Sequence, residues 1–182
     1  MLTGFFYFRM KFEGMKKIIA GFVTIIFLMS CQENEAIQDD FTGNEVVYPL
    51  QSGSVYQVSG TATLKEKKDG TTNIIIALTG TEGNIEHPVH LHLGNIAAPG
   101  ADIAALLNPV VGSTGKSETT FTMLADETAL SYSQLLDLNA CIKIHLAASG
   151  PDRDIILAGG NIGSAEGARI AGSEIIEICK SE

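Results

Sequence analysis

The stretch that decides the fold is His87-Pro88-Val89-His90-Leu91-His92-Leu93-Gly94, which holds three of the four histidines in the chain. Side chains of an extended strand alternate between its two faces. Val89 and Leu91 therefore share the face that packs on a core, whereas His90 and His92 share the opposite face. The pattern predicts a half-buried strand with two imidazoles pointing away from the core.

The fourth histidine lies in a second stretch of the same kind, Cys141-Ile142-Lys143-Ile144-His145-Leu146. The isoleucines of this stretch are expected to point inward and His145 outward. Imidazole is the commonest metal-binding side chain at neutral pH. If the two strands pair, the sequence predicts a copper or zinc site formed by three histidines: His90, His92 and His145.

A different interpretation of the same residues is that outward-facing histidines are simply solvated. His87 is a further candidate ligand, although Pro88 holds it at the mouth of the strand. Clustered imidazoles would repel one another's protons, which would lower their pKa values. Metal binding is expected to weaken below about pH 6.5, because a protonated imidazole has no lone pair to donate.

From about Val46 the sequence is mostly β. Turn residues such as Asp69-Gly70 separate short apolar stretches. The expected strands cover 54–64, 72–79, the histidine stretch, 117–123, 141–147, 155–158 and 174–179. Between them we expect a long loop at 95–108 with a helical turn at 103–107, a short helix within 129–138 and a glycine-rich stretch up to 172. Seven or eight short strands predict an all-β fold, an antiparallel Greek-key sandwich or barrel of immunoglobulin-like type with a short helical segment.

Residues 1–31 are predicted to be a signal peptide. A pair of lysines precedes an apolar run at 18–29, which is too short for a comfortable membrane span. The run ends in Leu28-Met29-Ser30-Cys31, which resembles the lipobox of bacterial lipoproteins. That resemblance implies cleavage before Cys31 and attachment of lipid to this cysteine, an anchor rather than a span. Met15 opens an ordinary signal sequence, so both Met1 and Met15 are candidate start sites.

Residues 32–45 are polar and are predicted to form a flexible tether. Residues 46–182 are expected to form a single β domain. The acidic residues directly after Cys31 resemble the surface-export signals of Bacteroidetes-type lipoproteins. We therefore expect the protein in the cell envelope, attached to the outer membrane through lipid on Cys31, on either the periplasmic or the cell-surface side.

The net charge and the absence of certain motifs limit which classes of binding partner and activity fit this chain. Residues 1–30 carry four basic residues and one acidic residue, so their removal changes the net charge from −9 to −12. Such an acidic chain argues against nucleic acid as a partner and is compatible with a metal cation or a basic protein. The chain has no Gly-x-Ser-x-Gly or Cys-x-x-Cys motif, which favours binding over catalysis without excluding an enzyme. Cys141 and Cys179 either pair in a disulfide or remain two buried thiols.

Several motifs, taken in order, resemble a CHRD domain, a module found in chordin and in many bacterial lipoproteins. The resemblance covers most of the chain from Val58 to Gly163 and rests on these pieces: Ser59-Gly60-Thr61-Ala62, 87–92, Gly112-Ser113-Thr114-Gly115-Lys116-Ser117, Leu130-Ser131-Tyr132-Ser133-Gln134-Leu135-Leu136, 142–146 and Gly160-Asn161-Ile162-Gly163. It implies a β domain and no established biochemical activity.

A more distant resemblance is to Cu/Zn superoxide dismutase, which is a Greek-key sandwich. His90-Leu91-His92 is similar to the copper-binding His-Val-His of that family, and Ile144-His145 to its later histidine strand. Gly160-Asn161-Ile162-Gly163-Ser164 and the later Arg169-Ile170 are similar to the family's C-terminal motif. The position of the family's metal-bridging histidine, two before Asn-Pro, is Leu106 here, and no further histidines remain for a zinc site.

Three functions follow from these observations. The first is a lipid-anchored CHRD-domain module of the cell envelope that binds an unidentified partner and carries a histidine-rich metal site. The second is a copper or zinc binding protein for sequestration or delivery. The third is a degenerate dismutase-like enzyme.

Overall fold

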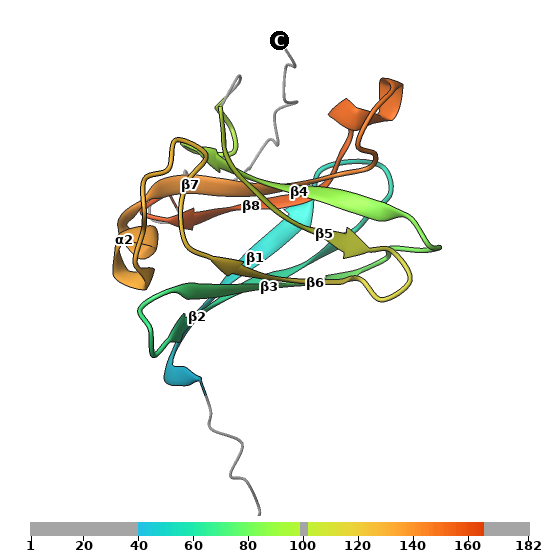
Figure 1. Ribbon diagram of the computed structural model, residues 1–182. Coiled ribbons are helices and arrows are strands. Elements are labelled where there is room, and N and C mark those ends of the chain that lie inside the picture. The colour runs from blue at the N-terminus through green and yellow to red at the C-terminus, as the bar shows by residue number, and fades with distance from the viewer. Residues whose placement is uncertain (1–39, 99–101, 166–182) are drawn as a thin grey trace, which may run out of the picture. The chain divides into compact units, whose positions relative to one another are not determined.

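The computed structural model describes residues 40–98 and 102–165. These residues form eight strands, one short α-helix and one 3-10 helix (Figure 1). The strands are β1 Phe41–Ser52, β2 Ser59–Lys67, β3 Thr72–Thr79, β4 Glu86–Leu93, β5 Ile103–Val111, β6 Lys116–Phe121, β7 Asn139–His145 and β8 Ile156–Gly163. The helices are α2 Tyr132–Asp137 and the 3-10 helix η2 Pro151–Asp154.

The eight strands close into an antiparallel barrel in the order β1-β2-β3-β6-β5-β4-β7-β8. Strand β3 pairs with β6, and β4 pairs with β7, so two connections cross an end of the barrel as in a Greek key. The barrel closes where β1 meets β8, through the pairs Gln51–Gly159 and Ser52–Ala158. This all-β antiparallel barrel with one short helix confirms the fold class predicted from the sequence.

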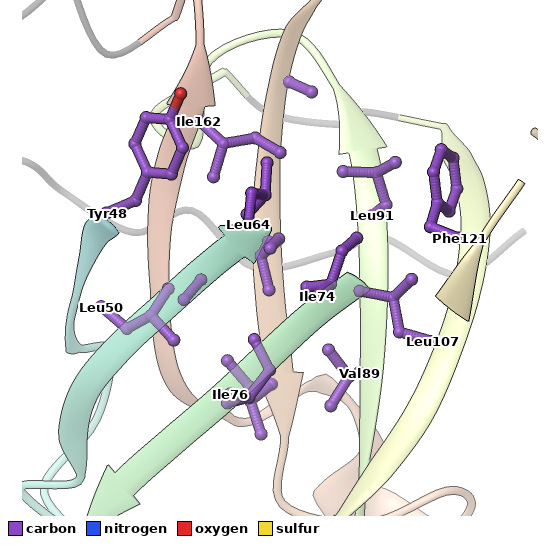
Figure 2. Close-up of a cluster of buried hydrophobic side chains, with 14 of the residues drawn as sticks. Tyr48, Leu50, Leu64, Ile74, Ile76, Val89, Leu91, Leu107, Phe121 and Ile162 are labelled. Atoms are coloured by element: carbon purple, nitrogen blue, oxygen red, sulfur yellow. The ribbon is translucent and has the colours of Figure 1, made fainter. Parts of the chain in front are cut away.

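The interior of the barrel is filled by aliphatic and aromatic side chains from all eight strands (Figure 2). Alternation along each strand supplies these residues, as in Ile74 and Ile76 of β3. Val89 and Leu91 of β4 point into the same core, together with Ile142 and Ile144 of β7. The inward face predicted for both histidine strands is therefore confirmed.

The short helix predicted within 129–138 is present as α2, and its start is encoded locally. The hydroxyl of Ser131 accepts a hydrogen bond from the backbone N–H of Gln134, whose side chain in turn accepts one from the N–H of Ser131. This reciprocal pair is a capping box. In residues 40–98 and 102–165 no helix is long and apolar enough to span a membrane.

The first strands differ from the prediction. Residues 41–45, expected at the end of the tether, belong to β1, and residues 54–58, expected in a strand, form the turn before β2. Most side chains at the start of β1 are polar and exposed, so its sequence resembles a tether. The turn contains Gln57 at a φ of 54°, a conformation outside regular strand geometry.

A larger error concerns 95–108, predicted as a loop with a helical turn at 103–107. Residues 103–111 instead form β5, which pairs with β4. The register of that pair shifts twice, between Leu91 and His92 and again between His87 and Val89. Each shift breaks the alternation of buried and exposed residues along β5. The apolar spacing of a bulged strand then imitates that of a helical turn.

Strand β8 is also longer than predicted, because it continues from Ala158 through glycines to Gly163. A Cβ atom on Gly160 would clash with the carbonyl oxygen of Pro49 in β1, so glycine allows the barrel to close at this point. The strand predicted at 174–179, and with it Cys179, lies outside the described residues.

Candidate metal centre

Three histidines meet on the outer side of the paired strands β4 and β7. The register of the pair places His90 opposite Lys143 and His92 opposite Cys141. His145 lies two residues beyond Lys143 on the same face of β7. The pairing predicted from the sequence is therefore present, and it brings His90, His92 and His145 together.

The three imidazoles form a compact group. The ring centroids of His90 and His145 are 4.6 Å apart, those of His90 and His92 are 5.8 Å apart, and those of His92 and His145 are 6.5 Å apart. One candidate ligand nitrogen from each ring lies within 4.8 Å of the other two. Nitrogens bound to one tetrahedral zinc lie about 3.3 Å apart, given Zn–N distances of about 2.0–2.1 Å. Closing the group around an ion thus requires side-chain shifts of about 1.5 Å at most.

The histidines point away from the barrel core, but two of them are not solvated. His92 is 1% exposed and His145 is 3% exposed, while His90 is partly exposed. The interpretation of outward-facing histidines as solvated residues is therefore wrong for His92 and His145. Two segments outside the barrel pack on this side of β7 and β8.

The first of these segments follows β4 and turns back at Gly94, whose φ of 91° favours glycine. The side chain of Asn95 then accepts a hydrogen bond from the N–H of Ala97, which stabilises the turn. The backbone N–H of Ile96 donates to Oδ1 of Asn161 in β8 at 2.7 Å, and Ile96 is fully buried. The Ile96 side chain packs over Gly159, where a Cβ atom would lie 2.7 Å from its terminal methyl group.

The second segment contains η2 and orients His145. Nδ1 of His145 lies 2.8 Å from the backbone carbonyl oxygen of Arg153 in η2. A carbonyl oxygen only accepts, so Nδ1 carries the hydrogen and donates it. In the neutral ring the lone pair is then on Nε2. Metal-binding histidines in proteins are commonly held by such a bond from the other ring nitrogen.

His90 contributes an unsatisfied nitrogen. Its Nδ1 is buried and has no hydrogen-bond partner among the described residues. Burial lowers the pKa of His90 to about 4, with further contributions from the neighbouring His145 and His92. The ring is therefore neutral at physiological pH and can donate a lone pair. Mutual repulsion of the imidazoles was expected from the sequence, but burial has the larger effect.

The pKa of His145 is also lowered. Burial is the main cause, the hydrogen bond to Arg153 acts against it, and the charge of Lys143 lowers the pKa further. Lys143 is the residue that the sequence analysis did not use. It is fully buried, and the alternation along β7 places it on the same face as His145. That alternation is the sequence signal that could have identified it.

His87, the candidate fourth ligand, lies outside this group. It is buried near the start of β4, and its Nδ1 donates to the carbonyl oxygen of Leu146 at 3.0 Å. Its position along β4 assigns it to the face of Val89, opposite to that of His90. The group identified among the described residues thus contains three histidines and neither a carboxylate nor a thiol.

The residues present fit a metal ion. Three imidazole nitrogens converge, two of the rings are neutral because of their lowered pKa values, and one is oriented by a backbone carbonyl. Three histidine ligands suit zinc or copper and leave a coordination position open. The chain is therefore a β-barrel protein with a largely buried three-histidine cluster that could hold a metal ion. Comparison of the chain with protein-family models, with curated proteins and with solved structures gave no match.

Proposed function

We propose that this protein binds a copper or zinc ion through His90, His92 and His145, for sequestration or delivery of the metal in the cell envelope. The observation that carries the proposal is the convergence of the three ligand nitrogens within 4.8 Å of one another. Histidines that were simply solvated on a sheet surface would not be expected to converge and to be buried together. The Nδ1 atom of His90 is buried without a hydrogen-bond partner among the described residues, which costs free energy, and a bound ion would use such a lone pair.

The location of the protein is part of the same proposal. The lipobox-like ending at Cys31 supports a lipid anchor, and the acidic residues after it support the outer membrane. The motifs that resemble a CHRD domain support a binding module rather than an enzyme. On this view the metal ion is the ligand of the module, or it stabilises the surface that binds a further partner.

A dismutase-like activity receives less support. Leu106 occupies the position at which that resemblance places a metal-bridging histidine. It lies on β5, paired in register with His90, and its side chain is 72% exposed. Without a bridging histidine, this chain lacks a residue that would hold the second metal of such enzymes. Metal storage or transfer therefore requires fewer assumptions than a dismutase activity.

The test is titration of the purified full-length chain, in detergent, with Zn²⁺ and with copper. We expect one ion per chain and a higher melting temperature, because an ion that binds only the folded state stabilises it. At a free concentration 100 times the Kd, this stabilisation is about 2.7 kcal/mol. Retention of the same melting temperature at saturating metal would contradict the proposal.

Two substitutions make the test specific to the site. His145→Asn keeps an amide N–H that can donate to the carbonyl of Arg153 but lacks the Nε2 lone pair, so it should fold and lose metal binding. His87→Asn is the matched control, because it makes the same change at a histidine that donates to Leu146 and lies outside the group. If the two variants bind metal equally well, the three-histidine site does not exist.

A further inference from the structure

The 3-10 helix η2 is a small element of the surface that contacts the candidate metal centre. Pro151, Asp152 and Arg153 are exposed, and no side chain of η2 is buried. Its internal hydrogen bonds are local. The N–H of Arg153 donates to the carbonyl of Gly150 at 3.4 Å, and the N–H of Ile155 donates within the same turn at 3.2 Å. Apolar burial therefore contributes little to holding η2 against the barrel.

A proposed metal ligand supplies the hydrogen bond that ties η2 to the barrel within the described residues. Nδ1 of His145 donates to the carbonyl oxygen of Arg153 at 2.8 Å. The strands β7 and β8 flank η2, and the loop between them is closed at its base, where the N–H of Leu146 donates to the carbonyl of Ile155 at 2.9 Å. The bond from His145 thus determines whether η2 is docked within this loop.

An ion bound at Nε2 of His145 would change the strength of this hydrogen bond. A bound cation is a large local charge that withdraws electron density from the ring. The Nδ1–H then becomes a stronger donor, and hydrogen bonds with a charged partner are about twice as strong as those between neutral groups. Removing such a partner from a metal-binding histidine typically costs about 10- to 100-fold in metal affinity.

The effect works in both directions. If docking of η2 raises the metal affinity by some factor, the metal must favour the docked state of η2 by the same factor. In the docked state the bond from His145 to Arg153 is made, and in the undocked state it is broken. Because no side chain of η2 is buried, this bond is a large share of what separates the two states.

We propose that the metal regulates η2. An ion in the three-histidine site holds η2 docked on His145, and the empty protein releases η2 more often. The proposal rests on the proposed metal-binding function and adds a regulatory output to the same site. Asp152 and Arg153 are exposed, so the state of a largely buried site is displayed on the surface, where a loaded chain differs from an empty one.

Hydrogen exchange of the backbone amides, followed by mass spectrometry on the full-length chain in detergent, measures how often η2 undocks. The chain is compared without metal and with saturating Zn²⁺, and in a parallel series with copper. We expect the metal to slow exchange at 150–155 by about 10- to 100-fold. The turn at 68–71 is the internal reference, because its hydrogen bonds involve none of the three histidines, and it should keep its rate.

Two glycine substitutions test the reverse direction. Gly150 has a φ of 78° and Gly70, in the reference turn, has a φ of 84°. A Cβ atom on either glycine would meet no atom within 4 Å, so alanine strains the backbone at both positions without a clash. Gly150→Ala should speed exchange in η2 and weaken metal binding. Gly70→Ala should destabilise the protein and leave the metal affinity unchanged.

The outcomes separate the two proposals. If neither ion binds the wild-type chain, the proposed function itself is wrong. If an ion binds but slows exchange in η2 and in the reference turn by the same factor, it only stabilises the whole fold. The regulation of η2 is then wrong while metal binding stands. Equal metal affinities of Gly150→Ala and Gly70→Ala would also contradict the regulation. The wild-type exchange rates decide the question even if Gly150→Ala fails to fold.

Discussion

Burial and two neighbouring imidazoles all lower the pKa of His90. The pKa of this ring is about 4, whereas the ordinary value for histidine is about 6.5. A folded chain therefore resists protonation of His90 over a pH range in which an unfolded chain takes up the proton. The stability of the metal-free protein is linked to pH through this difference.

We predict that the free energy of unfolding of the metal-free protein falls as the pH is lowered from about 6.5 to about 4. Between these values the unfolded state binds more protons than the folded state, so acid favours unfolding. His90 is partly exposed, and after allowance for solvent screening its contribution is on the order of 1–2 kcal/mol. Urea unfolding at several pH values checks this.

His90→Gln is the matching variant for this prediction, because an amide does not titrate. Its free energy of unfolding should depend less steeply on pH between 4 and 6.5 than that of wild type. Equal pH dependence in the two proteins would mean that His90 is not held neutral in the folded state.

The same lowered pKa values revise the pH range expected for metal binding. From the sequence, binding was expected to weaken below about pH 6.5. His90 and His145 both remain unprotonated to a lower pH than free imidazole. Proton competition at these two ligands is therefore expected to begin further on the acid side. A metal titration at pH 7 and pH 5.5 measures the loss of affinity, which should be smaller than for three imidazoles with the ordinary pKa.

Among the elements, the turn that follows β4 packs against the outer side of β8, next to the strand that carries His145. It is tied to the barrel by the hydrogen bond from the Ile96 N–H to Asn161. We predict that Asn161→Ala destabilises the protein by about 1–3 kcal/mol, because a buried N–H loses its acceptor. The rate of metal release should rise, since the turn beside the strand of His145 is loosened. Chelator-induced release followed by absorbance measures that rate.

Ser131→Ala provides the comparison at another element. It removes the capping box of α2 and should cost about 1 kcal/mol. The hydrogen bonds of His145 and of the turn after β4 involve no residue of α2, so Ser131→Ala should leave the rate of metal release unchanged. Faster release in both variants would show that general stability, rather than the turn after β4, controls access.

The strands also show which parts of the fold and of the candidate site could be predicted from the sequence. Alternation in β4 and β7 was regular, so the faces of their side chains and the meeting of three histidines were predictable from it. Strand β5 was missed because two register shifts interrupt its alternation. The burial of the site was missed for a different reason. It depends on contacts between segments distant in sequence, such as Ile96 with Asn161, and no local pattern encodes them.

At the scale of the whole molecule, the lipid anchor proposed from the sequence at Cys31 leads to a further prediction. We predict that Cys31→Ser prevents lipid attachment and releases the protein from the membrane fraction. Fractionation of cells with detection of the protein in membrane and soluble fractions measures this outcome. If the variant still sediments with membranes and keeps residues 1–30, the apolar run at 18–29 is a membrane span and the lipoprotein interpretation is wrong.

The topology of the barrel also determines at which stage of folding the three histidines come together. His145 follows His92 by 53 positions, and the two histidines come together only when β7 has paired with β4. An unfolded chain keeps the histidines of the 87–92 stretch close in sequence, but it does not bring His145 to them. Long-range strand pairing is slow compared with local structure formation. The three-histidine site proposed above is therefore complete only after β7 has paired with β4.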